Sequence, residues 1–186
     1  MIALLTLIAA TATPPPVDRT MELTSERSEE ALAAGHYGKL TLHSVVEEGG
    51  KLGSLTVAQS SGSDLLDNET LASLEGGSIR GSQPGDLVAI EIDYLPFNPD
   101  DIPGYTCRQA GLDLGWWQSL SPDNEATNSS IYHMLSGLLL LATMDKGSSA
   151  DVAARYKAFR ANFATALDRC ADRPDDGFLA TAVKSD

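Results

Sequence analysis

The sequence has few of the residues from which catalytic and metal sites are usually built. It holds two cysteines and three histidines in 186 residues, and His36, His43 and His133 show no metal-ligand spacing. His43 and Glu47 are four residues apart, but the motif His-Glu-x-x-His is absent, as are a Gly-x-Ser-x-Gly elbow and a phosphate-binding glycine loop. We therefore expect a protein that is not an enzyme and that needs no metal or other cofactor.

Basic residues are also scarce. The chain has 13 Lys and Arg against 26 Asp and Glu, which gives a net charge of -13. The first 98 residues carry most of this excess, with 14 acidic and 5 basic side chains. Duplex nucleic acid and anionic lipid surfaces would be repelled by such a field, so we expect neither as a partner.

Long hydrophobic runs are missing. The apolar start, residues 1–12, ends in Ala10-Thr11-Ala12, which has the small-x-small form of a secretory cleavage site. It is too short for a transmembrane anchor, which needs about 20 apolar residues. We expect a signal peptide and export. A linker with three consecutive prolines should follow over residues 13–28, and the polar stretch Val17–Glu30 is predicted as a loop leading into a first helix.

Residues 38–58 alternate between apolar and polar side chains in two runs. Leu40, Leu42 and Val46 alternate with Lys39, Thr41 and His43, and Leu55 and Val57 alternate with Thr56 and Ala58. A period of two is typical of half-buried strands. We predict a β-hairpin with a polar loop at Glu47–Lys51, followed by a turn at Ser60-Ser61-Gly62 in which the serines bind turn backbone groups.

A helix and a third strand should follow the hairpin. Asp67 is predicted as the helix N-cap, with Leu66 and Leu71 as a hydrophobic staple, and Gly76-Gly77 as the end. From Leu87 to Leu95 the apolar residues Val88, Ile90, Ile92 and Tyr94 alternate with Ala89, Glu91 and Asp93. The predicted fold class is α+β, with a small antiparallel three-stranded sheet and a helix packed on its dry face.

These segments resemble the C-terminal domain of the TonB family. The resemblance rests on G-K-L-T-L-x-x-V-V-E-x-G in the first run and on L-T-V-x-x-S-S-G-x-x-x-L-D across the second run and the turn. It covers residues 29–97, and Ser28–Gly35 stands where the family has a short helix. The usual Tyr-Pro before that helix is absent, as are the membrane anchor and long proline-rich spacer of the energy transducers.

The resemblance implies a periplasmic module with a protein or peptide partner, in which the domain binds an extended peptide segment such as that of an outer-membrane transporter. In the family the last strand of the unit receives the peptide by strand addition, because an unpaired sheet edge offers main-chain hydrogen-bonding groups. Carried over to this chain, the receiving strand comprises Leu87, Val88, Ala89, Ile90, Glu91, Ile92, Asp93, Tyr94 and Leu95. The charges of Glu91 and Asp93 are typical of an edge strand.

Residues 98–175 are predicted to be helical, after a turn-rich boundary at Asn98–Gly104. Ile131, Leu135, Leu138 and Ala142 repeat at helical spacing, and so do Val152, Tyr156, Phe159, Phe163, Leu167 and Cys170. Two helices, Tyr132–Met144 and one that starts at Ser148 or Ser149, should form an antiparallel hairpin. Trp116-Trp117 is predicted to anchor this core rather than to form an exposed recognition patch, and residues 176–186 are predicted to be a loose tail.

The two cysteines, Cys107 and Cys170, indicate the compartment. In an exported protein an even cysteine count predicts one disulfide, whereas two free thiols would be the default in the cytoplasm. We therefore predict a Cys107–Cys170 disulfide.

Three functions remain open at this point. The first is the peptide-binding module, and the second is an envelope structural or regulatory protein whose helical half covers the receiving strand. The third is an enzyme with its site wholly within residues 98–186. The first two differ in whether Leu87–Leu95 is open, which the sequence does not reveal.

Overall fold

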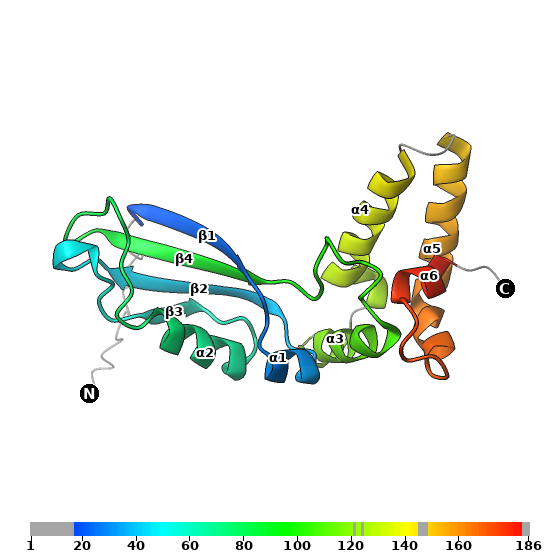
Figure 1. The fold of residues 1–186 in the computed structure, drawn as a ribbon, viewed down its shortest axis with the longest axis horizontal. Helices are drawn as coiled ribbons and strands as arrows, with labels where there is room; N and C mark the ends of the chain where they lie inside the picture. The colour runs from blue at the N-terminus through cyan, green and yellow to red at the C-terminus, as the bar shows by residue number, and fades with distance from the viewer. Residues whose placement is uncertain (1–16, 121, 124, 145–148, 184–186) are drawn as a thin grey trace, which may run out of the picture.

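The computed structural model describes residues 17–120, 122–123, 125–144 and 149–183, and it places a sheet unit beside a helical unit (Figure 1). The sheet unit contains β1 (Arg19–Ser25), α1 (Glu29–Ala34), β2 (Gly38–Val45), β3 (Thr56–Gln59), α2 (Asp64–Leu74) and β4 (Leu87–Tyr94). The helical unit contains α3 (Cys107–Leu120), α4 (Ser130–Met144), α5 (Ser149–Cys170) and α6 (Phe178–Val183). The predicted α+β class, a sheet followed by a helical region, is confirmed.

The sheet has four strands rather than three, in the order β1-β4-β2-β3. β2 is antiparallel to β3 and β4, whereas β1 is parallel to β4, so the sheet is mixed. The prediction of a loop over Val17–Glu30 is wrong for residues 19–25, which form β1. Six of the seven β1 residues are exposed. Because few of its side chains must be apolar to meet the core, the segment lacks the strong hydrophobic pattern by which a strand is predicted.

One face of the sheet carries a hydrophobic core. Leu40 and Leu42 of β2 are fully buried, and Val88, Ile90, Ile92 and Tyr94 of β4 are buried beside them. Ala31 of α1 and Leu66 of α2 complete this core, and α2 runs along the sheet in Figure 1. The predicted alternation of β2 and β4 is confirmed.

The start of α2 differs from its prediction. Its N-cap is Ser63, whose hydroxyl accepts a hydrogen bond from the Leu66 amide at 3.3 Å. Asp67 is instead a buried residue of the first turn, and its carboxylate accepts bonds from the hydroxyls of Ser60 (2.5 Å) and Ser61 (2.7 Å) and from the Ser61 amide (3.0 Å). The Asp67 cap prediction is wrong because this carboxylate closes the preceding serine turn.

A second core fills the helical unit. Phe159 and Phe163 of α5 are fully buried against Ile131 and Leu135 of α4, as the helical-hairpin prediction required. The prediction of a loose tail is wrong for residues 178–183, because Phe178 is fully buried in the same core and starts α6. Among the helices described, none combines the length and apolar character that crossing a membrane requires.

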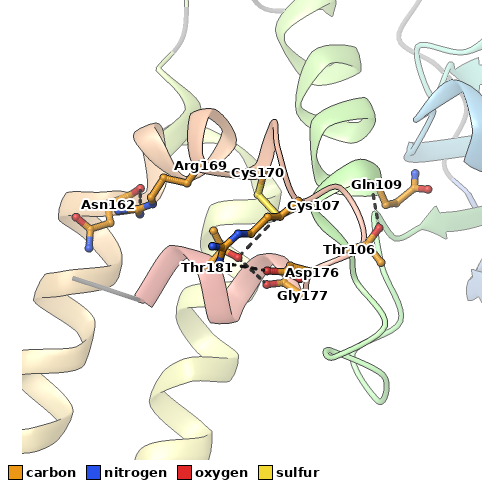
Figure 2. The surroundings of a disulfide bond; sticks show 10 residues. Thr106, Cys107, Gln109, Asn162, Arg169, Cys170, Asp176, Gly177 and Thr181 are labelled. Carbon is orange, nitrogen blue, oxygen red and sulfur yellow. Dashed lines mark hydrogen bonds and ion pairs between the residues drawn. A yellow bond between two sulfur atoms is a disulfide. The ribbon is translucent and has the colours of Figure 1, made fainter. Parts of the chain in front are cut away.

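The predicted Cys107–Cys170 disulfide is present and is confirmed. It joins the first residue of α3 to the last residue of α5, with the two Cα atoms 5.3 Å apart (Figure 2). The Cys107 amide also donates to the Asp176 carbonyl at 2.8 Å, just before α6. The disulfide joins α3 to α5, and this hydrogen bond ties the segment before α6 to the same point.

The two units meet where α1 packs on α3. Gly35, the C-cap of α1, has a φ of 72°, and a Cβ there would lie 2.4 Å from the carbonyl carbon of Leu112. Only glycine allows both this left-handed conformation and this approach of two backbones. Tyr37 and Phe97, which flank the sheet, pack into the helical core and Trp116 and Trp117 lie half-buried against it, in agreement with their predicted role.

Candidate functional site

The strand predicted to receive a peptide lies inside the sheet. β4 is paired with β2 on one side and, over its length from Val88 to Tyr94, with β1 on the other. The prediction that Leu87–Leu95 is an edge strand is therefore wrong in the structure. The physical reason is β1, a segment that local patterns did not identify as a strand.

The peptide groups of β4 alternate between its two neighbours. The Leu87 carbonyl accepts a hydrogen bond from the Asp18 amide (2.8 Å), on the β1 side, whereas the Asp86 carbonyl accepts one from the Val46 amide (2.9 Å), on the β2 side. Since successive peptide groups of a strand point in opposite directions, Ala89, Glu91 and Asp93 direct their amides and carbonyls toward β1. These are the hydrogen-bonding groups that an added strand would use.

Hydrogen bonds at its ends hold β1 in place more than the packing of its side chains does. At its start the Asp18 carboxylate accepts a bond from the Leu87 amide (2.8 Å), and the Arg19 guanidinium donates to the Arg80 carbonyl (3.2 Å). Only Met21 is half-buried, and Leu23 is 42% exposed. Backbone pairing therefore supplies most of what keeps β1 in place.

The solvent-facing side of β1 and β4 is acidic. Glu22 lies beside Glu91 in the parallel register, and Thr24 lies beside Asp93. Lys39 of β2 forms an ion pair with Glu91 at 2.5 Å. The hydrogen bond and charge of Glu91, together with the charges of Glu22 and Asp93, raise the pKa of Lys39. Three carboxylates thus surround one ammonium group.

The far end of β1 runs into a buried ion pair. Arg27 donates to the Asp113 carboxylate of α3 at 2.8 Å and also to the carbonyls of Pro96, just after β4, and His36. Tyr105 and Gln109 donate to the same carboxylate, at 3.1 and 2.8 Å. Burial raises the pKa of Asp113, while the Arg27 guanidinium opposes this rise. The chain is therefore fixed at Arg27.

A cleft opens beside this junction. It has a volume of about 600 Å³ and is lined by residues 24–27, Leu32, Leu95 and residues 97–100. Thr24, Ser25 and Glu26, at and just after the end of β1, form part of its wall, and Leu32 of α1, which is 37% exposed, is another lining residue.

The histidines take part in local contacts. The Nδ1 of His36 lies 2.8 Å from the Ser63 hydroxyl, and its ring is 3.9 Å from that of Trp116. His43 is half-buried on β2, and His133 is exposed on α4. In the part of the chain that the structure describes, no group of three or more His, Cys, Asp or Glu side chains could hold a metal ion.

Sequence reasoning did not identify β1 or the Arg27–Asp113 pair. A weak signal for β1 exists, because apolar Met21 and Leu23 alternate with polar Thr20, Glu22 and Thr24. No local pattern marks the ion pair, since its partners are 86 positions apart.

Most of the sheet unit matches a known protein family. The family described as Gram-negative bacterial TonB protein C-terminal matches residues 28–98, from the N-cap of α1 to just beyond β4. No curated protein and no solved structure gives a significant match to the chain. The family implies an interaction module of the energy-transducer type in the cell envelope, and β1 and the helical unit lie outside the matched segment. Residues 28–98, a segment of the 186-residue chain, match the TonB C-terminal domain family.

Proposed function

We propose that the domain is a non-catalytic module that binds an extended peptide of the outer-membrane transporter type by strand addition to β4. The observation that carries this proposal is the pairing of β4 with β1. An extended segment from outside the family domain already occupies the edge formed by Ala89, Glu91 and Asp93. That edge has the geometry to hold a strand, and a peptide would take the place of β1.

Main-chain hydrogen bonds would supply most of the affinity. An added strand pairs with the outward amides and carbonyls of β4, whatever its side chains are. Selectivity would come from charge, because Glu91 and Asp93 favour neutral or basic segments over acidic ones.

The periplasm is the compartment proposed for this activity. A structural disulfide persists in an oxidising compartment, and the family belongs to the cell envelope. The predicted signal peptide, residues 1–12, lies outside the described residues.

Amide chemical shifts measured by NMR test the proposal on the full chain. Extended segments of outer-membrane transporters should shift the amides of Ala89, Glu91 and Asp93 more than those of Val88 and Ile90, which point toward β2. Binding at the other edge of the sheet would instead shift residues 56–59 of β3. That result, or no shift at any strand, would contradict the proposed site.

A second candidate function follows from the covered state of β4. If β1 never leaves, the domain has a structural or regulatory role in the envelope, although the cover comes from β1 and not from the helical half as expected. Hydrogen exchange distinguishes the two. A permanent β1 predicts that the Ala89, Glu91 and Asp93 amides exchange only through global unfolding, whereas a replaceable β1 predicts faster, local exchange.

A further inference from the structure

We propose that β1 is a built-in competitor for the partner peptide, and that a peptide with a basic residue at the position of Glu22 displaces it from β4. This inference rests on the proposed function, because it concerns the occupancy of the same edge. It assigns β1 a regulatory role and gives the partner a chemical property.

Competition follows from the pairing. The peptide groups of Ala89, Glu91 and Asp93 can form a ladder with one strand at a time, and β1 uses them in the structure. An incoming strand therefore gains these hydrogen bonds only where β1 gives them up. The apparent affinity for the peptide is the intrinsic affinity multiplied by the fraction of molecules in which β1 is undocked.

β1 can leave β4 while the chain stays anchored at Arg27. The family match starts at residue 28, after β1, and Arg27 is fixed by Asp113 and by the Pro96 carbonyl. Ser28 independently caps α1 by accepting a bond from the Ala31 amide. The chain can therefore detach up to Glu26, a residue that lies between the end of β1 and this fixed point.

The side chains of β1 match the edge poorly. Leu23 is 42% exposed although it lies beside Ile92, a core residue. Glu22 lies beside Glu91, and together with Asp93 these residues place three carboxylates near the single ammonium of Lys39, so like charges in neighbouring positions are in excess, which is destabilising. A lysine or arginine at that position would meet Glu91 and, nearby, Asp93. Charge complementarity therefore favours a basic peptide over the chain's own strand.

The test uses the full chain with its disulfide intact and three variants. In this register the Leu23 amide pairs with the Glu91 carbonyl, whereas the Thr24 amide points away from the sheet. Leu23→Pro should release β1, and Thr24→Pro is its matched control, since proline is tolerated where the amide of an edge strand is free. Glu22→Lys should hold β1 more firmly by removing the repulsion from Glu91.

The probe is a fluorescent peptide copy of residues 18–25 that carries the Glu22→Lys change. We expect it to bind Leu23→Pro at least about tenfold more tightly than the wild type, and Thr24→Pro like the wild type. The Glu22→Lys chain should bind it about fivefold more weakly than the wild type, and the unchanged peptide copy should bind every chain more weakly than the lysine version.

Three results would each overturn a different part of the proposal. Equal affinity of the wild type, Leu23→Pro and Glu22→Lys, with shifts at Ala89, Glu91 and Asp93, would refute the competition and leave strand addition standing. Absence of binding to Leu23→Pro, although hydrogen exchange shows those amides to be unprotected, would refute strand addition itself. Stronger binding of the unchanged copy than of the lysine version would refute the basic preference.

Discussion

Arg27 and Asp113 form a buried ion pair, 2.8 Å long, that joins the sheet unit to the helical unit. The side chains of both residues are almost completely shielded from water, at 3% and 0% exposure. The guanidinium also binds carbonyls next to α1 and β4, so one residue holds β1, the exit of β4 and α3 in a fixed arrangement. A movement of β1 would therefore stop at this residue.

Asp113→Asn should destabilise the protein by about 3 to 5 kcal/mol, because it leaves the Arg27 charge buried and unpaired. Urea denaturation of the purified chain measures the change. Asp175→Asn is the matched control, since its ion pair with Arg108 (3.1 Å) lies at the surface. That control should change stability by at most about 1 kcal/mol. Equal effects of the two substitutions would contradict the structural role of the buried pair.

Loss of the disulfide should destabilise the helical unit. The bond closes a loop with a sequence separation of 63, for which chain entropy gives about 4 kcal/mol as an upper value. The double substitution Cys107→Ala and Cys170→Ala should lower the melting temperature. The amide NMR signals of β2 and β4 should still be those of a folded sheet. Mass spectrometry of protein from its native compartment should find the two cysteines linked, and free thiols would contradict both the bond and export.

Phe159→Ala and Phe163→Ala should each cost about 3 to 5 kcal/mol, because both rings are fully buried and leave a cavity. Their rings lie 5.4 Å apart and both contact Tyr132, so the double substitution should be non-additive. Lys157→Ala on the exposed side of α5 is the control and should change stability by less than about 0.5 kcal/mol. Unchanged thermal unfolding of both phenylalanine variants would be incompatible with the second core.

Alkaline pH should destabilise the protein through Tyr37. Burial raises the pKa of Tyr37 from 10.0 to about 12. Between these values the unfolded chain has lost a proton that the folded chain keeps, so stability falls as pH rises through this window. The contribution is fully present below pH 10.0. As pH rises through this window, the urea midpoint should fall less steeply for Tyr37→Phe than for the wild type. Identical slopes would rule out Tyr37 as a source of the pH dependence.

Much of the fold could be predicted because its signals are local. The alternation in Leu40–Val46 and Val88–Tyr94 reports which side of a strand meets the core, and the spacing of Phe159 and Phe163 reports the buried side of a helix. The order of hairpin, helix and strand allowed the TonB resemblance to be recognised. The two cysteines allowed one pairing, and it is the pairing observed.

The errors share a different cause. Asp67 has the chemistry of an N-cap, but Ser63 takes that position because the Asp67 carboxylate binds the Ser60-Ser61 turn. Residues 178–183 follow an acidic, turn-like segment, and only their contact with the second core makes them a helix. In each case a contact outside the predicted pattern decided the outcome: hydrogen bonds to Ser60 and Ser61, seven and six positions earlier, for Asp67, and a tertiary contact with the second core for residues 178–183.

The sequence by itself determined the class of the protein: an acidic α+β chain with a TonB-type segment, a helical unit and a disulfide. These properties follow from composition and from patterns within about twenty residues, which act through local backbone preferences and burial. The tertiary structure alone decided that β1 covers β4 and that Arg27 meets Asp113. Those contacts join residues about 70 and 86 positions apart, and their free energy exists only when the folded chain brings the partners together.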